Sequence, residues 1–174
     1  MEGIIEREII TDVDQTLALL PFHHVLPLMV TLVVIYSGAS IIFVPRIASK
    51  EMLEALGRNR VTIMVGVPRV YKLLADGIKA QIDSSFLARQ IYKSTKIIRS
   101  IKLRNIIFSK KKKKTGSNIK QLISGGAKLD VEVGEIFERL GFYVTEGYGL
   151  TETSPIIAVA TIKERKLGTV GKLL

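Results

Sequence analysis

Apolar residues along this chain alternate between short continuous runs and segments with helical spacing, and this alternation predicts the order of its elements. The continuous runs are rich in β-branched residues and predict strands over 14–20, 41–44, 61–65, 119–124 and 142–144. Strands that are apolar throughout are typical of parallel strands covered on both faces. We therefore expect an α/β fold, with a mainly parallel sheet, helices on both faces and right-handed crossovers.

Between these runs, apolar residues recur every three or four positions, which predicts helices. Ser49 and Asp130 suit the N-cap position, and Gly38, Gly57 and Gly141 suit the left-handed conformation that ends a helix. The predicted helices cover 25–37, 49–57, a segment from 69 onward, about 86–103, and 130–141. The side chains expected to face inward are Met52, Leu53 and Leu56, then Val70, Leu73, Leu74 and Ile78, and finally Val133, Ile136, Phe137 and Leu140.

The composition narrows the class of protein. The chain has 174 residues, of which 47% are hydrophobic and 24% charged, and this balance is typical of a globular chain. It has no cysteine and only two histidines, which excludes disulfides, thiolate metal sites and a histidine-based zinc site. The N-terminus is acidic and lacks the layout of a signal peptide, so a cytoplasmic location is expected.

The most apolar segment, 15–44, contains no Lys, Arg, Asp or Glu, and its part from 25 to 44 has the length of a transmembrane helix. Pro27 lies near the start of that part, Gly38 interrupts it and Pro45 follows it. A strand, a buried helix and a second strand explain the same residues. We therefore expect no transmembrane helix.

The net charge of +10 is concentrated in one region. Thirteen of the 26 Lys and Arg residues lie between Ser84 and Leu129, a stretch without any acidic residue, and we expect a basic helical and loop segment over about 84–118. Such a segment is either a solvated loop or a peripheral contact with an anionic membrane or a polyphosphate. No base-reading module accompanies it, so we expect no specific binding of nucleic acid. Its densest part, the lysine run, is Lys110-Lys111-Lys112-Lys113-Lys114.

One segment near the C-terminus combines an aromatic ring, two glycines, three hydroxyls and two carboxylates. Glycine lets the backbone approach a ligand closely, a tyrosine ring can stack on a planar base, and oxygen donors suit a phosphate-bound Mg²⁺. Taken alone, the segment is equally consistent with a Gly-rich turn that binds nothing. It reads Glu146-Gly147-Tyr148-Gly149-Leu150-Thr151-Glu152-Thr153-Ser154-Pro155.

Three further segments precede it, each at the end of a predicted strand, where parallel sheets bind ligands. The diglycine segment lies twenty-odd residues before the tyrosine segment, a pairing that ordinary turn chemistry does not predict. In chain order the three segments are Leu20-Pro21-Phe22-His23-His24-Val25, Gly66-Val67-Pro68-Arg69-Val70-Tyr71 and Leu122-Ile123-Ser124-Gly125-Gly126-Ala127-Lys128-Leu129.

In this order the segments resemble the motifs of the adenylate-forming (AMP-binding) superfamily, which includes acyl-CoA synthetases, adenylation domains and beetle luciferases. The tyrosine segment is similar to its Tyr-Gly-x-Thr-Glu motif, and the diglycine segment to Ser-Gly-Gly-Ala-x-Leu. The first segment is similar to Leu-Pro-Leu-Phe-His, with His24 in the histidine place and His23 where the family has an aromatic residue. The likeness is strongest to long-chain fatty-acid–CoA ligases.

This resemblance implies roles for individual residues. Ser124, Gly125, Gly126 and Ala127 would bind the nucleotide, with Glu146, Gly147 and Gly149 bordering the base and Tyr148 stacking on adenine. Thr151 would hydrogen-bond the α-phosphate, Glu152 would ligate Mg²⁺, and His24 would gate the passage between the adenylate and acyl pockets. The cofactors and co-substrates implied are ATP or AMP, Mg²⁺ and coenzyme A.

The resemblance covers the chain from about Asp12 onward, and it implies that residues 1–174 are a fragment, the middle part only, of the AMP-binding N-terminal domain. The family's Ser/Thr/Gly-rich phosphate loop does not occur in residues 1–20, and its ribose-binding aspartate and mobile-domain lysine would lie beyond residue 174. We therefore expect a chain that is inactive alone, and exposed sheet edges that favour self-association.

The function implied is ATP-dependent conversion of a long-chain fatty acid to acyl-adenylate and then acyl-CoA. Within the same family, an acyl-carrier-protein ligase or an amino-acid adenylation domain is the alternative. From a different class, the chain could be a non-catalytic basic α/β module that binds anionic membranes through the lysine run.

Overall fold

The β-branched runs form a single sheet whose strands are mostly parallel. A computed structural model describes residues 4, 7, 9–44, 46–95, 98, 100, 101, 103, 104, 118–153 and 155–174. The strand order is β2-β1-β3-β4-β5-β6-β7; strands β1 to β5 pair in parallel, and β6 and β7 are antiparallel additions. The strands are β1 Gln15–Ala18, β2 Ser40–Phe43, β3 Ile63–Gly66, β4 Gln121–Ser124, β5 Tyr143–Tyr148, β6 Ala158–Val159 and β7 Lys172–Leu173.

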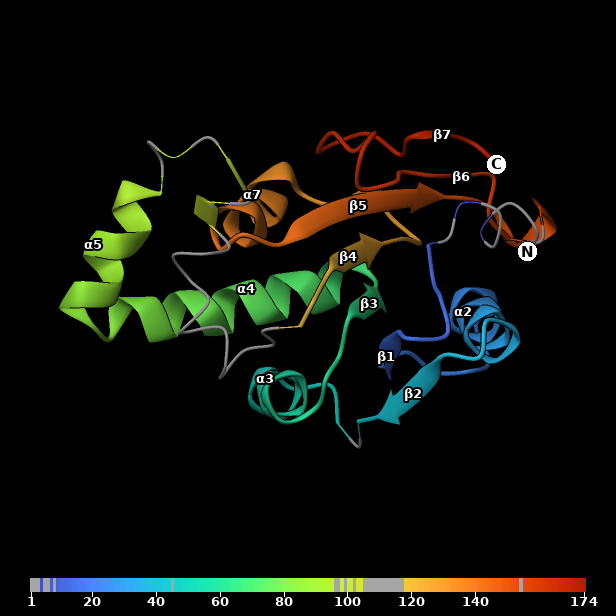
Figure 1. The fold of residues 1–174 in the computed structure, drawn as a ribbon, viewed down its shortest axis with the longest axis horizontal. Helices are drawn as coiled ribbons and strands as arrows, with labels where there is room; N and C mark the ends of the chain where they lie inside the picture. The colour runs from blue at the N-terminus through green and yellow to red at the C-terminus, as the bar shows by residue number, and fades with distance from the viewer. Residues whose placement is uncertain are drawn as a thin grey trace.

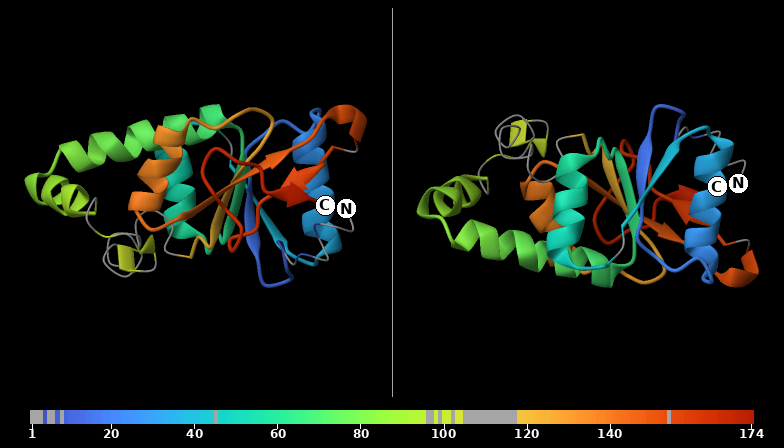
Figure 2. Two further views of the ribbon diagram at one scale, coloured as in Figure 1. Left: turned by 90° about the horizontal axis from the view of Figure 1, so that it is seen from above. Right: turned by 90° about the horizontal axis from the view of Figure 1, so that it is seen from below.

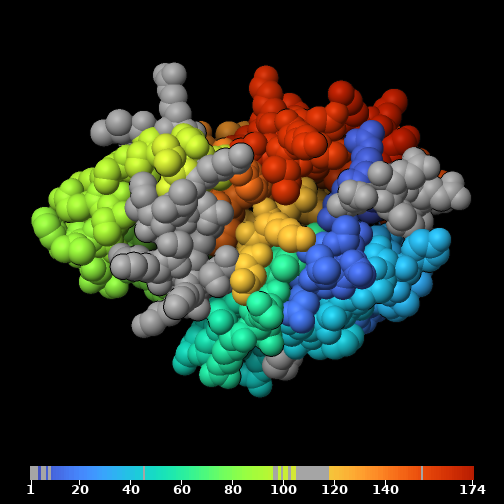
Figure 3. Space-filling model, viewed as in Figure 1, coloured from blue at the N-terminus to red at the C-terminus, as the bar shows by residue number. Residues whose placement is uncertain are grey.

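Helices cover both faces of this sheet, as the sequence predicted (Figures 1 and 2). Helices α3, α4 and α7 pack on one face in the larger apolar cluster, and α2 packs on the other face through Val33 and Val34. Figure 3 shows α5 at one end of the molecule and α2 with β2 at the other. The helices are α2 Val25–Tyr36, α3 Ser49–Arg58, α4 Pro68–Asp83, α5 Phe86–Ser94, α7 Val131–Arg139 and the short 3-10 helix η1 Thr151–Thr153.

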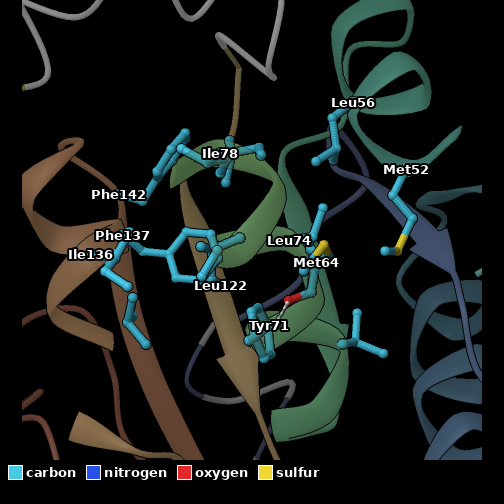
Figure 4. Packing of buried hydrophobic residues seen from close by; sticks show 14 of the residues in the cluster. Met52, Leu56, Met64, Tyr71, Leu74, Ile78, Leu122, Ile136, Phe137 and Phe142 are labelled. Atoms are coloured by element: carbon cyan, nitrogen blue, oxygen red, sulfur yellow. Dashed lines mark hydrogen bonds between the residues drawn. The ribbon is translucent and has the colours of Figure 1, made fainter. Parts of the chain in front are cut away.

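Tyr71 of α4 lies at the centre of the larger cluster and is fully buried (Figure 4). Its ring makes an edge contact with Phe137 of α7. Its hydroxyl lies 2.8 Å from the backbone oxygens of both Met64 in β3 and Ile123 in β4. One side chain therefore connects a helix to two neighbouring strands.

Several local predictions are confirmed. The Asp130 carboxylate accepts a hydrogen bond from the Glu132 amide at 3.0 Å and caps α7. Gly38 and Gly141 follow the ends of α2 and α7 with φ of 70° and 82°. The charge-free segment folds as β1, α2 and β2. Across the described residues, no helix combines the length and the apolar character that a bilayer crossing would need.

Other predictions are wrong. Ser49 is the first residue of α3 and not its cap, because its hydroxyl donates instead to the Leu73 carbonyl at 2.7 Å. Gly57 lies inside α3. Leu73 is 38% exposed, because the buried stripe of α4 runs through neighbouring positions, Tyr71 and Ala75 among them.

The boundaries of two elements also differ from prediction. The helix expected over about 86–103 ends at Ser94 as α5. In the rest of that range only residues 95, 98, 100, 101 and 103 are described, and the lysine run lies wholly outside the described residues. Strand β5 continues to Tyr148, so the first three residues of the expected loop are strand. The reason is pairing with β6, a two-residue strand too short to be recognised from periodicity.

Candidate nucleotide-binding site

The carboxyl ends of β3, β4 and β5 meet at one edge of the sheet and border a cleft of about 870 Å³. This volume is within the range of small-molecule sites, roughly 300–1,000 Å³. The described residues lining the cleft include most of those singled out from the sequence: His23, His24, Ser124, Gly125, Gly126, Gly147, Tyr148, Gly149, Thr151 and Glu152.

Two motifs far apart in the sequence share this cleft because their strands are neighbours. Ser124 at the end of β4 is in register with Glu146 of β5. The chain after Ser124 continues through Gly125, whose amide donates to the Gly66 carbonyl at 3.0 Å, and through Gly126, whose φ of 80° favours glycine. The diglycine segment thus forms the cleft wall beside Gly147 and Tyr148.

The diglycine segment lies close to Leu26 of α2 and to Val67, the residue before α4. A Cβ atom on Gly125 would lie 3.5 Å from Leu26, and one on Gly126 would lie 3.5 Å from Val67. Gly125 is buried and Gly126 is exposed, so neither glycine places a side chain in the cleft. This flat surface of peptide groups suits a planar ligand edge.

The hydroxyl of Ser124 is buried and has no hydrogen-bond partner among the described residues. Buried polar groups are nearly always paired, so an unpaired hydroxyl at a cleft wall favours a polar ligand there. This observation is independent of the motif resemblance. The residues present therefore fit a polar ligand such as a nucleotide.

Tyr148 ends β5 and is 50% exposed, so its ring is available for stacking. Gly149 follows it at a sharp reversal, where a Cβ atom would lie 1.7 Å from the Pro155 carbonyl oxygen. No other residue fits there without moving the backbone. This close approach fixes the direction in which the chain leaves Tyr148.

Thr151 and Glu152 lie in η1, on the rim of the cleft, and both are exposed. The Thr153 hydroxyl accepts a hydrogen bond from the Leu150 amide at 3.0 Å, which stabilises this turn. Neither the Thr151 hydroxyl nor the Glu152 carboxylate is paired within the described part of the chain. One free carboxylate beside phosphate oxygens and water is a common ligand set for Mg²⁺.

Among the described residues, no group of three or more His, Asp or Glu side chains could hold a metal ion by itself. Mg²⁺ would need oxygen ligands from a substrate in addition to Glu152. The residues therefore fit a metal carried by a phosphate better than a metal in an all-protein cage.

Two residues expected in the site lie outside the cleft lining, Ala127 and Glu146. Glu146 is 5% exposed, and its carboxylate accepts hydrogen bonds from the Leu129 amide at 3.2 Å and the Gly168 amide at 2.9 Å. It therefore joins the segment after the diglycine turn to the segment before β7. This contact could not be predicted from the sequence, because Gly168 lies 22 residues after Glu146.

His23 and His24 line the cleft just before α2, with ring centroids 4.2 Å apart. His24 is the N-cap residue of α2, but its side chain makes no capping hydrogen bond.

Several lining residues were not predicted from the sequence. They are apolar and have no chemical signature: Ile4, Ile9, Ile10, Leu150 and Ile156.

A mainly parallel sheet with a ligand-sized cleft at its carboxyl edge defines a ligand-binding α/β domain. The model of the AMP-binding enzyme family matches residues 2–174, so the chain belongs to the AMP-binding enzyme family.

Similar curated proteins are long-chain-fatty-acid–CoA ligases. The chain is 28% identical to FadD15 of Mycobacterium tuberculosis over 91% of its own length and 29% of that protein. It is 30% identical to long-chain-fatty-acid–CoA ligase 1 of Saccharomyces cerevisiae over 92% of its length and 25% of that protein. The chain thus spans between a quarter and a third of the length of these relatives.

Solved structures support the fold. Apo MatB from Rhodopseudomonas palustris matches 99% of the chain and 28% of its own chain, with a TM-score of 0.71 and 22% identity. MenE from Bacillus subtilis, in complex with ATP and magnesium ion, matches with a TM-score of 0.65 and 20% identity over 99% of this chain and 29% of its own. At these identities the likeness shows the fold alone.

Proposed function

We propose that this chain forms the nucleotide-binding and part of the acyl-binding surface of an ATP-dependent ligase. The reaction would convert a long-chain fatty acid to acyl-adenylate and pyrophosphate, and the thiol of coenzyme A would then displace AMP. The observation that supports this most directly is the cleft shared by the diglycine segment and the tyrosine segment. Family membership and the long-chain-fatty-acid–CoA ligases among the relatives support the chemistry.

The proposed nucleotide contacts follow from the lining residues. Peptide groups of Gly125 and Gly126 would face the edge of adenine, the Ser124 hydroxyl would gain a partner, and the ring of Tyr148 would stack on the base. The Thr151 hydroxyl would donate to the α-phosphate as the carboxylate attacks and negative charge develops. Glu152 would hold Mg²⁺, which, when bound, offsets that charge.

The fatty-acid substrate is proposed from the apolar part of the cleft. Side chains of α2 and of the strands line it beyond the nucleotide residues, including Leu26, Met29, Val33, Val65 and Ile123. An alkyl chain would displace water from these surfaces. His24 lines the same cleft as this apolar part and the diglycine segment, and we assign it the gate between the two.

A carrier-protein ligase or an amino-acid adenylation domain would use the same nucleotide residues. The proposal of a fatty acid as substrate and coenzyme A as acceptor therefore rests on the relatives and on the apolar part of the cleft. We expect residues 1–174 to bind nucleotide without completing turnover, because the phosphate loop of the family does not occur in residues 1–20. Membrane contact through the lysine run is also proposed; that run lies outside the described residues.

Calorimetric titration of the 174-residue chain with AMP, and with ATP in the presence and absence of Mg²⁺, tests the assignment. Tyr148→Ala should weaken AMP binding about tenfold or more, since stacking of a base on an aromatic ring contributes about 1–3 kcal/mol. Glu152→Gln should weaken ATP binding only when Mg²⁺ is present.

Matched controls are Tyr36→Ala and Glu132→Gln, exposed residues of the same types away from the cleft. Both should bind nucleotide as the wild type does. A wild-type chain that binds neither AMP nor ATP would refute the proposal. An Mg²⁺ dependence unchanged in Glu152→Gln would remove the metal role of that residue.

A further inference from the structure

Two large apolar side chains at the start of α5 lie in solvent. Phe86 is 70% exposed and Leu87 is 69% exposed, and they are the first two residues of the helix. Ser85 caps α5, its hydroxyl accepting a hydrogen bond from the Ala88 amide at 3.4 Å. The Ser85 cap therefore fixes the start of α5 at Phe86, and both apolar side chains of this first turn remain exposed.

Two basic residues lie on the same side of this helix. Arg89 and Lys93 follow Phe86 by three and seven positions, which places them on its face, and both are exposed. The guanidinium of Arg89 donates to the Asp83 carbonyl at 2.8 Å, which keeps it beside the turn between α4 and α5. We call Phe86, Leu87, Arg89 and Lys93 the α5 outer face.

The opposite side of α5 explains why the helix is held in place. Ala88 is buried, and Ile91 and Tyr92 pack against the larger apolar cluster. The guanidinium of Arg139 in α7 lies 5.8 Å from the centroid of the Tyr92 ring. Packing of α5 against the core thus uses its inner side, while the outer face contributes the hydrogen bond of Arg89 to Asp83 and leaves Phe86 and Leu87 in solvent.

The position of α5 makes its outer face accessible to a flat surface. The helix lies at the end of the molecule opposite the chain termini, beyond the last turn of α4 (Figures 1 and 2). The sequence from Ser84 to Leu129 has thirteen basic residues and no acid. The acidic residue Asp83 ends α4, just before this basic stretch.

We propose that the α5 outer face docks on an anionic lipid membrane, with Phe86 and Leu87 inserted at the interface and Arg89 and Lys93 against the headgroups. An amphipathic helix with apolar residues beside Lys and Arg lies in the interfacial plane of such membranes. Each basic residue near an anionic surface strengthens binding by about fivefold. This surface is independent of the nucleotide cleft.

Charge complementarity favours a lipid surface over another protein segment as the occupant. A protein cover over Phe86 and Leu87 would have to supply acidic partners for Arg89 and Lys93 at the same time. An anionic bilayer supplies both partners: an apolar layer for Phe86 and Leu87, and negatively charged headgroups for Arg89 and Lys93.

Vesicle sedimentation with the complete 174-residue chain tests the proposal. Phosphatidylcholine–phosphatidylserine vesicles should bind the wild type, and pure phosphatidylcholine vesicles should bind it much more weakly. The double variant Arg89→Gln/Lys93→Gln should lose about tenfold or more in affinity, and Phe86→Ser/Leu87→Ser should lose a similar amount. The control Lys50→Gln/Lys72→Gln removes the same charge from exposed positions on α3 and α4 and should change binding much less.

A fluorescence measurement separates insertion from simple charge attraction. The chain has no tryptophan, so Phe86→Trp introduces a single reporter. Its emission should shift to the blue with anionic vesicles and be quenched by lipids brominated along their acyl chains. Phe43→Trp, at an equally exposed site on β2, should show neither change.

Three results would overturn the proposal. The wild-type chain could fail to bind anionic vesicles, the two double variants of the α5 outer face could bind as the wild type does, or brominated lipids could fail to quench the Phe86→Trp reporter. In the second case, loss of binding in a variant with all five lysines of the run changed to Gln would show that binding depends on that run. Circular dichroism of each variant checks that α5 changes have not unfolded the chain.

Discussion

The two halves of this sheet differ in how completely their apolar side chains are buried. We call strands β3 to β5 with their helices the closed half, and strands β1 and β2 with α2 the open half. Strands β3, β4 and β5 are covered by α3, α4 and α7, and the cluster between them contains large side chains that are fully buried, such as Met52 and Tyr71. Helix α2 packs on strands β1 and β2, and Leu17 of β1 and Ile42 of β2 also contact the larger cluster, yet large apolar side chains of α2 and β2 remain in solvent. Their exposed fractions range from 42% to 71%: Leu28, Leu32, Ile35, Tyr36 and Phe43.

The joint between the two halves, which is the pairing of β1 with β3, is also narrow. Strands β3 and β4 pair over four residues each, whereas the pairing of β1 with β3 is confined to Thr16 and Ile63. The same apolar composition therefore gives a closed core in one half and an open apolar surface in the other. We infer that the β3–β5 half provides most of the folding stability and that the β1–β2 half provides the surface for association.

The largest expected effect tests the closed half. Tyr71→Ala should lower the free energy of unfolding by about 3–5 kcal/mol, because it opens a cavity in the core and removes the hydroxyl shared by β3 and β4. Tyr36→Ala removes the same side chain from the open half, where it is 71% exposed, and should change stability by less than about 0.5 kcal/mol. Urea unfolding followed by circular dichroism measures both; equal losses would contradict the comparison.

The second effect concerns association of the open half. We expect the chain to self-associate through α2 and the unpaired edge of β2, since an apolar edge strand is a template for pairing. Ile35→Lys combined with Phe43→Lys should weaken association about tenfold or more, because each apolar side chain buried contributes about 1.5–3 kcal/mol.

Sedimentation velocity over a range of concentrations measures this association. Leu73→Lys is the matched control, since Leu73 is an exposed leucine on α4 in the closed half. It should leave the sedimentation behaviour unchanged. A wild-type chain that stays monomeric throughout, or a control as disruptive as the double variant, would show that the open half is not the associating surface.

What the sequence could predict divides along similar lines. Signals that act within one turn or one strand end were sufficient for the Asp130 cap, for Gly141, and for the meeting of the two motifs at the carboxyl edge of neighbouring parallel strands. Contacts between distant segments were not predictable. The hydroxyl of Tyr71 reaches Ile123 across 52 positions, and the carboxylate of Glu146 reaches Gly168 across 22.

The errors have the same physical origin. Ser49 and Gly57 have the local chemistry of helix ends, but Ser49 finds its partner on α4 and α3 continues through Gly57. Tertiary contacts decided both positions against local propensity. Glu146 was expected at the base because it belongs to the tyrosine segment, yet its carboxylate accepts hydrogen bonds from the amides of Leu129 and Gly168.

The smallest expected effect tests the joint between the halves. Asp14, just before β1, is 2% exposed. Its carboxylate accepts hydrogen bonds from the Lys120 ammonium at 2.7 Å, the Thr62 hydroxyl at 2.7 Å and the Thr11 amide and hydroxyl. Burial raises the pKa of Asp14, but these hydrogen bonds together outweigh burial and hold the pKa below its ordinary value. One carboxylate thus joins β1 to the segments that precede β3 and β4.

Because the pKa of Asp14 is lower in the folded chain than in the unfolded chain, its contribution to stability is fully present above the unfolded value of about 3.9. It is lost as the pH falls through the folded pKa, which lies lower. Asp14→Asn should cost about 1–3 kcal/mol at neutral pH, since donors from Lys120 and Thr62 lose a charged acceptor, and should flatten the acid limb of the stability profile.

Hydrogen exchange at single-amide resolution shows whether Asp14 connects the two halves or stabilises the whole fold equally. In Asp14→Asn, amides of β1 and α2 should exchange faster while those of β4 keep their protection, because the open half would separate before the closed half unfolds. Thr161→Ala, which removes an exposed hydroxyl–carboxylate contact with Glu164 far from β1, should leave both sets unchanged. Equal acceleration in β1 and β4 would mean that the two halves unfold as one unit and that the narrow pairing of Thr16 with Ile63 is not a weak point.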